Sequence, residues 1–370
     1  MEGNVKSIQM IMKNVLLVLL VLTNLFSAQV ITDTIFGKPK FVREYVKFLS
    51  TKGPYTFMEG DDEYGHSTRM EPEYLRSSMS ESWFETNFCR YTNNKTYYDE
   101  NRNITREIWY YKSGDLVSEY QYKYDKRNRI IKISDSSNYS MGVKQNYYRN
   151  KDAKPFVSES VRTVYGEKPE KYGGFINSFP DMAVSEYDTI ARRENVYYIT
   201  NKKNIVNADG SYHEIRDSVF NKVLIRHNYY DTKWRMVKSI PIYIDNKGVS
   251  TNMGDYRTYD YDGFDRKVKE TSYQRSGSVS YTTYQYNEND YVTDLQSFSK
   301  NRLLYQNKFS YDGNYIIKLE TYSSSSTRDS LESHIVLFKY KFDKYKNWTR
   351  IIKNVNGKDL YEWRREIVYY

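Results

Sequence analysis

The chain has few of the residues that form covalent or metal-centred sites. Its 370 residues include one cysteine, Cys89, which excludes an intrachain disulfide and a zinc site made of several thiolates. The four histidines are scattered, and neither an H-E-x-x-H nor a G-x-S-x-G motif occurs. A P-loop and a dinucleotide-binding fingerprint are also missing. We therefore expect a protein without a cofactor, a metal or an enzymatic activity.

Apolar residues and prolines are scarce as well. Hydrophobic residues, with tyrosine counted, make up 39% of the chain, and the mean hydropathy is −0.83. A disordered chain would be poor in aromatic residues, whereas this one is 17% aromatic and contains 41 tyrosines. Tyrosine joins a large apolar ring to a hydroxyl that requires a partner, so it suits the half-exposed faces of a sheet. None of the seven prolines follows Pro241, which favours uninterrupted strand pairing beyond that residue.

A short apolar run lies near the N-terminus. Lys13 precedes the run from Val15 to Leu22, and small residues follow up to Ala28. A basic start, a short apolar segment and a small-residue exit are typical of a secretory signal peptide, and the run is shorter than a membrane-spanning helix needs. We predict a signal peptide over residues 1–28 that is cleaved after Ala28. The mature protein is then expected outside the cytoplasm, secreted or in the periplasm or cell envelope, without a transmembrane span.

Charge of one sign is not concentrated anywhere in the chain. The 56 Lys and Arg residues and the 47 Asp and Glu residues give a formal net charge of +9, but the two signs are interspersed. This pattern is typical of a solvated surface, with a polyanion site as the alternative. We expect no specific nucleic-acid partner.

Residues 29–96 differ in residue composition and pattern from the rest of the chain. Residues 31–49 are rich in β-branched and aromatic types and predict two strands, or a strand and a short helix. Residues 71–84 predict one short helix that begins near Pro72. The segment from Gly60 to His66 gathers three carboxylates and an imidazole, which could bind calcium or magnesium. Its spacing fits no EF-hand loop, and glycine-flanked acids are common in exposed turns. The sequence therefore assigns no metal ligand.

A tyrosine-rich tetrad recurs within residues 97–370. It has the form aromatic-x-aromatic-Asp/Asn in most copies, and the last four copies start 25, 25 and 31 residues apart. The copies begin at Tyr122, Tyr259, Tyr284, Phe309 and Tyr340, and their second aromatic residues are Tyr124, Tyr261, Tyr286, Tyr311 and Phe342. Residues i and i+2 of a strand share a face, so each copy places two rings on one side before a turn. The period predicts hairpins that bury one another's faces, with structural rings.

Two of the turns after these tetrads resemble a known motif. The hexads are Tyr124 to Arg129 and Tyr261 to Arg266, with Asp125 and Asp262 at the second position and Arg129 and Arg266 at the sixth. They are similar to the Y-D-x-x-G-R core of YD-repeat, RHS-like proteins. Asn128 and Asp265 stand at the family's glycine, and both residue types enter the left-handed region at modest cost. The resemblance implies a ribbon of β-hairpins, which in large relatives forms a shell around a C-terminal toxin, and it also extends to secreted envelope proteins of the Bacteroidetes type.

The period slackens between residues 150 and 228. Pro169, Pro180 and the Gly173-Gly174 pair predict a loop excursion over residues 166–180, which is either a tolerated insertion or a binding loop. Elsewhere Gly114 and Asn128 are expected to supply the positive φ that tight hairpins require.

The sequence therefore predicts an all-β fold, a ribbon or solenoid-like sheet of antiparallel hairpins. It leaves open whether the ribbon stays open or closes into a shell. The expected function is a non-enzymatic, exported repeat protein that binds or scaffolds another macromolecule, protein or glycan, at the cell envelope. A carbohydrate-binding or carbohydrate-active protein and a part of an RHS-like toxin-delivery system remain as alternatives.

Overall fold

The computed structural model describes most of the chain as strand. The described residues are 35–49, 80–89, 93–111, 113–138, 140–148, 155, 157–165, 175–188, 190–206, 212–244, 250–251, 254–324 and 331–370. The expected signal peptide and the acidic cluster at Gly60 to His66 lie outside these residues. Of the helix expected over residues 71–84, residues 80–84 are described and are helical. The prediction of an antiparallel all-β fold is confirmed.

The strands follow one another along the chain with mostly short connections. They are β1 (Pro39–Phe48), β2 (Asn93–Tyr98), β3 (Ile104–Tyr110), β4 (Leu116–Tyr124), β5 (Ile130–Ser136), β6 (Ser140–Tyr147), β7 (Val157–Tyr165), β8 (Phe175–Asp188), β9 (Arg193–Val206), β10 (Tyr212–Tyr230), β11 (Met236–Pro241), β12 (Tyr243–Ile244), β13 (Ser250–Thr251), β14 (Tyr256–Tyr261), β15 (Lys267–Tyr273), β16 (Val279–Tyr286), β17 (Val292–Ser299), β18 (Arg302–Asp312), β19 (Tyr315–Ser324), β20 (Leu331–Phe342), β21 (Trp348–Val355) and β22 (Lys358–Tyr369). β12 and β13 form a small separate hairpin, and the other strands form one 20-stranded sheet.

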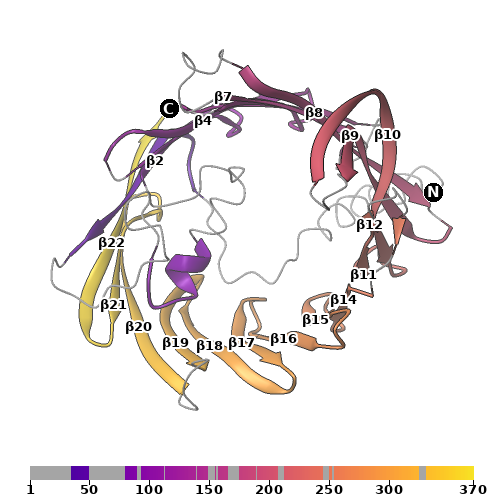
Figure 1. The fold of residues 1–370 in the computed structure, drawn as a ribbon. Helices are drawn as coiled ribbons and strands as arrows, with labels where there is room; N and C mark the ends of the chain where they lie inside the picture. The colour runs from indigo at the N-terminus through magenta and orange to yellow at the C-terminus, as the bar shows by residue number, and fades with distance from the viewer. Residues whose placement is uncertain are drawn as a thin grey trace, which may run out of the picture.

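The large sheet closes on itself. Consecutive strands pair from β2 to β11, β11 pairs with β14, and consecutive pairing continues to β22. β1 pairs with β2 on one side and with β22 on the other, so the first and the last strand are neighbours and the strands form a ring (Figure 1). Closure removes the unpaired strand edges that would otherwise invite association. The segment of residues 29–96 thus contributes β1 and β2 to the same sheet as the repeats.

Pairing also fixes which side chains face into the ring. Directly paired residues of antiparallel strands share a face, and that face alternates along each strand. On β3, β19, β21 and β22 the inward residues include large apolar ones: Trp109, Leu319, Ile351 and Tyr361 each have no exposed surface. A buried ion pair lies on the same face, where Arg365 Nη2 is 2.6 Å from Glu44 Oε1 and joins β22 to β1.

The helical turn at residues 80–84 lies inside the ring beside β18 and β19 (Figure 1). Trp83 packs edge-on against Trp363 with ring centroids 5.3 Å apart, and Phe84 packs against Phe338 at 5.5 Å. The hydrophobic core therefore forms between this turn and the inner faces of the strands around it. One side of the ring is filled in this way.

The loop excursion expected over residues 166–180 is shorter than the sequence indicated. Strand β8 already begins at Phe175, and Pro180 pairs with Val161 of β7. Proline lacks the N–H that a strand donates on one side, so it needs a position where that side carries no ladder bond. The described register of β8 with β9 begins only at Met182, which leaves Pro180 such a position. Residues 166–174 lie outside the described residues.

Candidate functional site

In four of the five tetrads, the hydroxyl of the second ring forms a hydrogen bond to a neighbouring strand. Four hydroxyls donate to main-chain oxygens of the neighbouring strand that precedes their own in the sheet: Tyr124 to Ile104 at 2.8 Å, Tyr261 to Met236 at 2.8 Å, Tyr286 to Lys267 at 2.6 Å and Tyr311 to Val292 at 2.7 Å. Each acceptor is the first residue of its strand. In the last copy the second ring is Phe342, which has no hydroxyl, and Tyr340 donates to Ile316 instead at 2.8 Å.

In most copies the aspartate or asparagine that follows the pair of rings organises the turn. Asp262 Oδ1 accepts the backbone N–H groups of Phe264 and Arg266, and Oδ2 accepts Arg266 Nε at 2.7 Å. Asp125 makes the same contacts with Arg127 and Arg129. The hydrogen bond from the Arg129 side chain is the main cause that lowers the pKa of Asp125. At Asp262, burial acts to raise the pKa, but the hydrogen bonds from Arg266 outweigh it and lower the value.

The residue before each arginine has a left-handed backbone, as the family's glycine would. Asn128 has φ 57° and Asp265 has φ 68°, and Gly114 has φ 94° in a similar turn between β3 and β4. The positive φ predicted at Gly114 and Asn128 is therefore present. The copy at Phe309 departs from this geometry, because Asp312 pairs with Tyr315 across a two-residue turn that contains Gly313.

The turns that follow the tetrads lie along one edge of the ring, which we call the rim. Arginines link neighbouring turns along it. Arg235 Nη1 lies 2.7 Å from Asp265 Oδ1, and its guanidinium lies 4.6 Å from the ring centroid of Tyr261. Arg266 repeats the pattern one hairpin later, where its guanidinium lies 4.8 Å from the Tyr286 centroid. The charged side chains of these neighbouring turns therefore bind one another.

The first rings of the tetrads lie on the inner wall. Tyr122 donates to Glu107 Oε2 at 2.5 Å, and Phe309 is buried in the core. Tyr259 and Tyr284 are half-buried, and burial raises the pKa of both hydroxyls. The structure therefore divides the sequence-predicted residues between the rim and the inner wall. It does not gather them into one pocket.

A hollow of about 690 Å³ lies on the inner face where β10, β11, β14 and β15 meet. Its position follows from the register: Ser239 pairs with Arg257, Arg257 pairs with Ser272, and Tyr259 pairs with Glu270. The same face continues through β16 to the buried Leu295 of β17. We call this hollow the chamber; its lining residues are Arg226, Ser239, Pro241, Asp255, Tyr256, Arg257, Tyr259, Ser272, Tyr273, Gln274, Arg275 and Ser276.

The chamber has an excess of positive charge. Arg226 and Arg257 both act on the Tyr259 hydroxyl and oppose the rise in its pKa that burial and Glu270 cause. The Glu270 carboxylate is bound more closely by Lys267, at 3.0 Å, than by Arg257, at 3.4 Å. The Arg257 side chain stays 61% exposed although it faces into the ring, so its guanidinium is accessible from the chamber.

The opposite part of the inner wall is acidic and filled. Glu85 follows the helical turn at residues 80–84, and burial together with the neighbouring Glu81 raises the pKa of Glu85 to about 7. Tyr284 lies between the two parts of the wall, because both Glu270 and Glu85 act on its hydroxyl.

Lys353 of β21 anchors this filled part. Its buried ammonium donates to the carbonyl oxygens of Ser82 at 3.1 Å, Trp83 at 2.6 Å and Phe88. These are carbonyls at the end of the helical turn, where a cation also suits the helix dipole.

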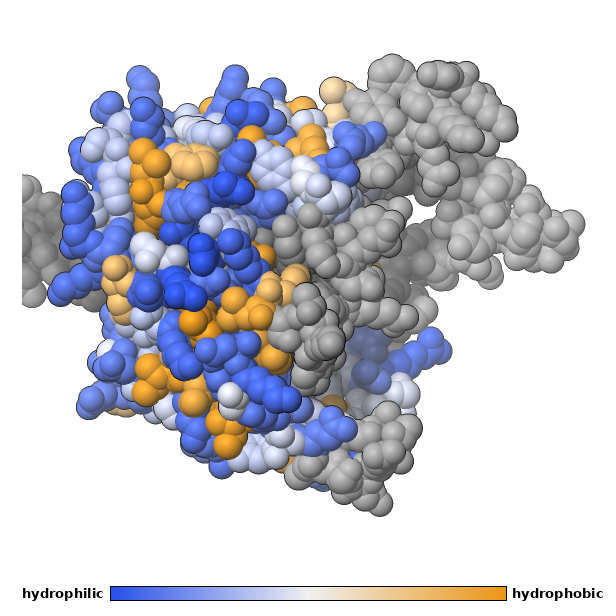
Figure 2. Space-filling view, turned by 90° about the vertical axis from the view of Figure 1, so that its left-hand side faces the viewer, coloured by the Kyte–Doolittle hydropathy of each residue, from blue (hydrophilic) through white to orange (hydrophobic). Residues whose placement is uncertain are grey.

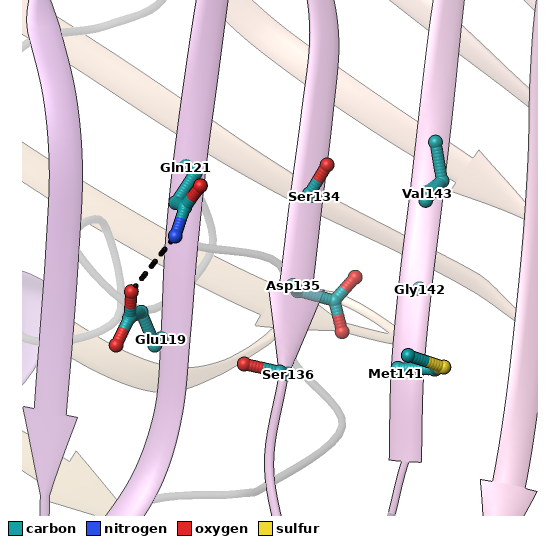
Figure 3. Close-up of a pocket in the computed structure, with 8 residues that line it drawn as sticks. All are labelled: Glu119, Gln121, Ser134, Asp135, Ser136, Met141, Gly142 and Val143. Carbon is teal, nitrogen blue, oxygen red and sulfur yellow. Dashed lines mark hydrogen bonds between the residues drawn. The ribbon is translucent and has the colours of Figure 1, made fainter.

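A second, smaller concavity of about 340 Å³ lies on the outer face of β4, β5 and β6. Ser134, Ser136 and Gly142 form its floor because they have short or no side chains, and Met141 and Val143 rise beside them (Figure 3). Glu119 on its other side accepts a hydrogen bond from Gln121 and pairs with Arg106 at 2.7 Å. This groove lacks the unneutralised charge of the chamber.

Sequence reasoning named Tyr259 as a structural ring but missed the other chamber residues and the anchor. Arg226 occurs in a strand with several other basic residues and Arg257 is the one basic residue of β14, and nothing in their spacing marks them as inward-facing. Lys353 likewise lies in an ordinary alternating strand. Only the register with neighbouring strands separates these three from the cations of the outer face, where polar and apolar side chains are mixed (Figure 2).

The described residues place no group of three or more His, Cys, Asp or Glu side chains so that it could hold a metal ion. They also include no helix of the length and apolarity needed to cross a membrane.

Comparisons with known proteins assign no family. No protein-family model and no curated protein matches the chain. Among solved structures, a chain of the crystal structure of TcdB2-TccC3-Cdc42 is 9% identical over 79% of this chain, with a TM-score of 0.31, and this chain spans 17% of its length. A porin-like protein from Bacteroides uniformis is 9% identical over 89% of this chain and 98% of its own, with a TM-score of 0.29. A chain of the Photorhabdus luminescens Tc holotoxin pore is 10% identical over 73% of this chain and 19% of its own, with a TM-score of 0.26. Similarity at this level identifies neither a family nor a function.

Proposed function

We propose that this chain is an exported, non-enzymatic β-repeat protein that binds another macromolecule at the cell envelope. The chamber carries the proposal. It is a concave, polar site on a closed and rigid sheet, and its volume falls within the roughly 300–1,000 Å³ of typical ligand sites. Export rests on the signal peptide expected over residues 1–28. The YD-repeat character rests on the Tyr-Asp turns and their arginines.

The binding surface in this proposal is the chamber, which includes the first tetrad ring Tyr259, and not the second rings of the tetrads. The hydroxyls of Tyr261 and Tyr286 are occupied by main-chain carbonyls, and arginines cover their ring faces. These rings therefore hold the hairpins together, whereas the guanidinium of Arg257 is accessible from the chamber.

The test is a glycan array and a pull-down from envelope extract with the mature chain, at low and at moderate salt. Wild type is compared with the double variant Arg226→Gln/Arg257→Gln and with Arg106→Gln, an arginine of the outer face whose loss should matter little. We expect a partner that persists at moderate salt and is lost only in the double variant. Binding that disappears at moderate salt in wild type would reduce the positive charge to nonspecific attraction.

One observation favours a second candidate, a carbohydrate-active enzyme. Glu85, whose pKa is raised to about 7, lies with Glu81 beside Tyr284 and Tyr305 on the inner wall. A carboxylic acid that stays protonated near neutral pH can act as a general acid in glycoside cleavage. Release of reducing ends from a bound glycan by wild type, and its loss in Glu85→Gln, would establish this candidate and overturn the non-enzymatic proposal.

A further inference from the structure

The chamber presents three kinds of group that together match one class of ligand. Arg226 and Arg257 supply guanidinium donors, Ser239 and Ser272 supply hydroxyls, and Tyr259 supplies a ring and a hydroxyl. Guanidinium groups bind carboxylates and sulfates with charge-assisted hydrogen bonds. Hydroxyls and an aromatic ring suit a ligand that is itself rich in hydroxyls and has apolar faces. Such a ligand is a sugar that carries negative charge.

The balance of charge requires that negative group. Among the described residues, Arg226, Arg257 and Lys267 act on this wall against the carboxylate of Glu270, and the lining also contains Arg275 and Asp255, one charge of each sign. Lys267 holds Glu270 at 3.0 Å, so the more distant Arg257 is incompletely neutralised. Arg275 lies in the turn after β15, where its backbone N–H donates to Asp255 Oδ1 at 2.8 Å. An uncharged sugar would leave the excess positive charge of the two inward arginines in place, because Glu270 is shared between Arg257 and Lys267.

Glu270 favours a ligand that carries hydroxyl donors as well as negative groups. A sugar hydroxyl can donate to its carboxylate while an acidic group on the same ligand meets the arginines. The wall continues from Tyr259 to Tyr284, which offers a second ring beyond the charged part.

On the basis of the proposed function, we propose that the chamber binds an acidic oligosaccharide, with Arg226 and Arg257 on its carboxylate or sulfate groups and Tyr259 against a sugar ring.

The experiment measures binding of an oligogalacturonate to the mature chain by titration calorimetry at moderate salt. The fully methyl-esterified oligosaccharide is the matched neutral ligand, because it keeps every ring and removes only the charge. We expect the ester to bind at least about tenfold more weakly. Arg257→Gln and Arg226→Gln should each weaken oligogalacturonate by about tenfold while retaining the wild-type circular dichroism spectrum, and Arg106→Gln on the outer face should bind as wild type does.

Three outcomes would overturn the inference. Equal affinity for the acid and its ester would show that charge is not recognised. Single-stranded DNA that binds as tightly as the oligogalacturonate would show that the chamber recognises anions in general. Binding that survives in both arginine variants would place the site elsewhere. In the first case the chamber would remain the binding site, provided that the arginine variants still lose affinity, so the proposed function would stand without this ligand class.

Discussion

At the scale of single residues, the tyrosine hydroxyls have two roles in this chain. Those of the rim donate hydrogen bonds to main-chain carbonyls, whereas the hydroxyl of Tyr259 in the chamber faces charged groups. The same residue type therefore serves structure at Tyr286 and is available for binding at Tyr259, depending on which neighbour the register supplies.

Tyr311 tests the structural role. Its hydroxyl donates to Val292 at 2.7 Å, and its ring stacks on Tyr291 with centroids 5.2 Å apart. Tyr311→Phe removes only the hydrogen bond and should lower the free energy of unfolding by about 1 kcal/mol. Tyr311→Ala also removes the packed ring and should cost about 3 kcal/mol. Urea unfolding measures both, and Phe264→Ala serves as the control because Phe264 is 79% exposed. Unchanged stability in Tyr311→Ala would mean that the ring is not part of the core.

Glu85 makes stability depend on pH. In the folded protein its pKa is about 7, whereas the unfolded chain has the ordinary value near 4.3. The folded state therefore keeps a proton that the unfolded state releases, so the stabilisation is complete below about pH 4 and is lost as pH rises through 7.

Glu85→Gln cannot ionise and should be more stable than wild type at pH 7.5 by up to about 3 kcal/mol, with little difference at pH 4. Urea unfolding at the two pH values gives the comparison, and the exposed Glu288→Gln is the control. Buried Lys353, whose pKa burial lowers to about 7, contributes a slope to both proteins, so the difference between them is what counts. An equal difference in stability between wild type and Glu85→Gln at both pH values would contradict the prediction.

At the scale of elements, the unit of this fold is the hairpin with its Asp-centred turn. The turn satisfies its own backbone through Asp125 or Asp262, and the following arginine reaches the next hairpin. Hydrogen bonds within the turn therefore stabilise each hairpin, and the arginine contact stabilises its packing on the next one. The stability of a repeat protein is likewise the sum of contributions from each repeat and from the interfaces between repeats.

Asn128 tests the turn. Its φ of 57° suits asparagine or glycine, and its side chain accepts only an exposed hydrogen bond from Asn103 at 3.2 Å. Asn128→Gly should change stability by no more than about 0.5 kcal/mol, because glycine adopts this φ freely. Asn128→Val should cost about 1–2 kcal/mol, because a β-branched residue is strained there. Thermal melts compare both with Lys126→Val in the same turn, and equal melting temperatures for the two valine variants would contradict the turn geometry.

At the scale of the whole molecule, closure of the sheet creates an interior, and one part of this interior is filled by side chains while another part is hollow. The turn at residues 80–84 and its anchor Lys353 fill one part, whereas the part beside β10, β11, β14 and β15 keeps the chamber. A ligand site of this kind needs the wall to be fixed, and pairing of β1 with both β2 and β22 fixes it.

A disulfide tests closure directly. Arg43 and Glu366 are direct partners in the β1–β22 register. Their Cα atoms should lie about 4.5–5.5 Å apart, within the range that a disulfide spans. Arg43→Cys/Glu366→Cys should therefore cross-link under mild oxidation, seen as a faster-migrating species on a non-reducing gel. Cys89 is buried and should not compete. Arg43→Cys/Lys339→Cys, with the second cysteine on β20, should stay reduced. A sheet that is open between β1 and β22 would leave both variants reduced.

The sequence by itself determined the local level of this protein. The aromatic residues at i and i+2, the aspartate after them and the left-handed residue before the arginine specify strand, turn and return, because each depends on neighbours within about six residues. This is why the all-β antiparallel class and the turn at Asn128 could be predicted. The loop over residues 166–180 was overestimated because the proline signal does not reveal on which side of Pro180 a strand lacks a partner.

Only the tertiary structure decided closure and the chamber. Whether β22 meets β1 depends on the summed twist and register of every strand between them, and no local pattern encodes that sum. The same register turns Arg226 and Arg257 inward while other cations of similar local sequence face outward. Inward direction is a property of pairing between segments far apart in the chain, so the residues that could bind a ligand became visible only once the ring was closed.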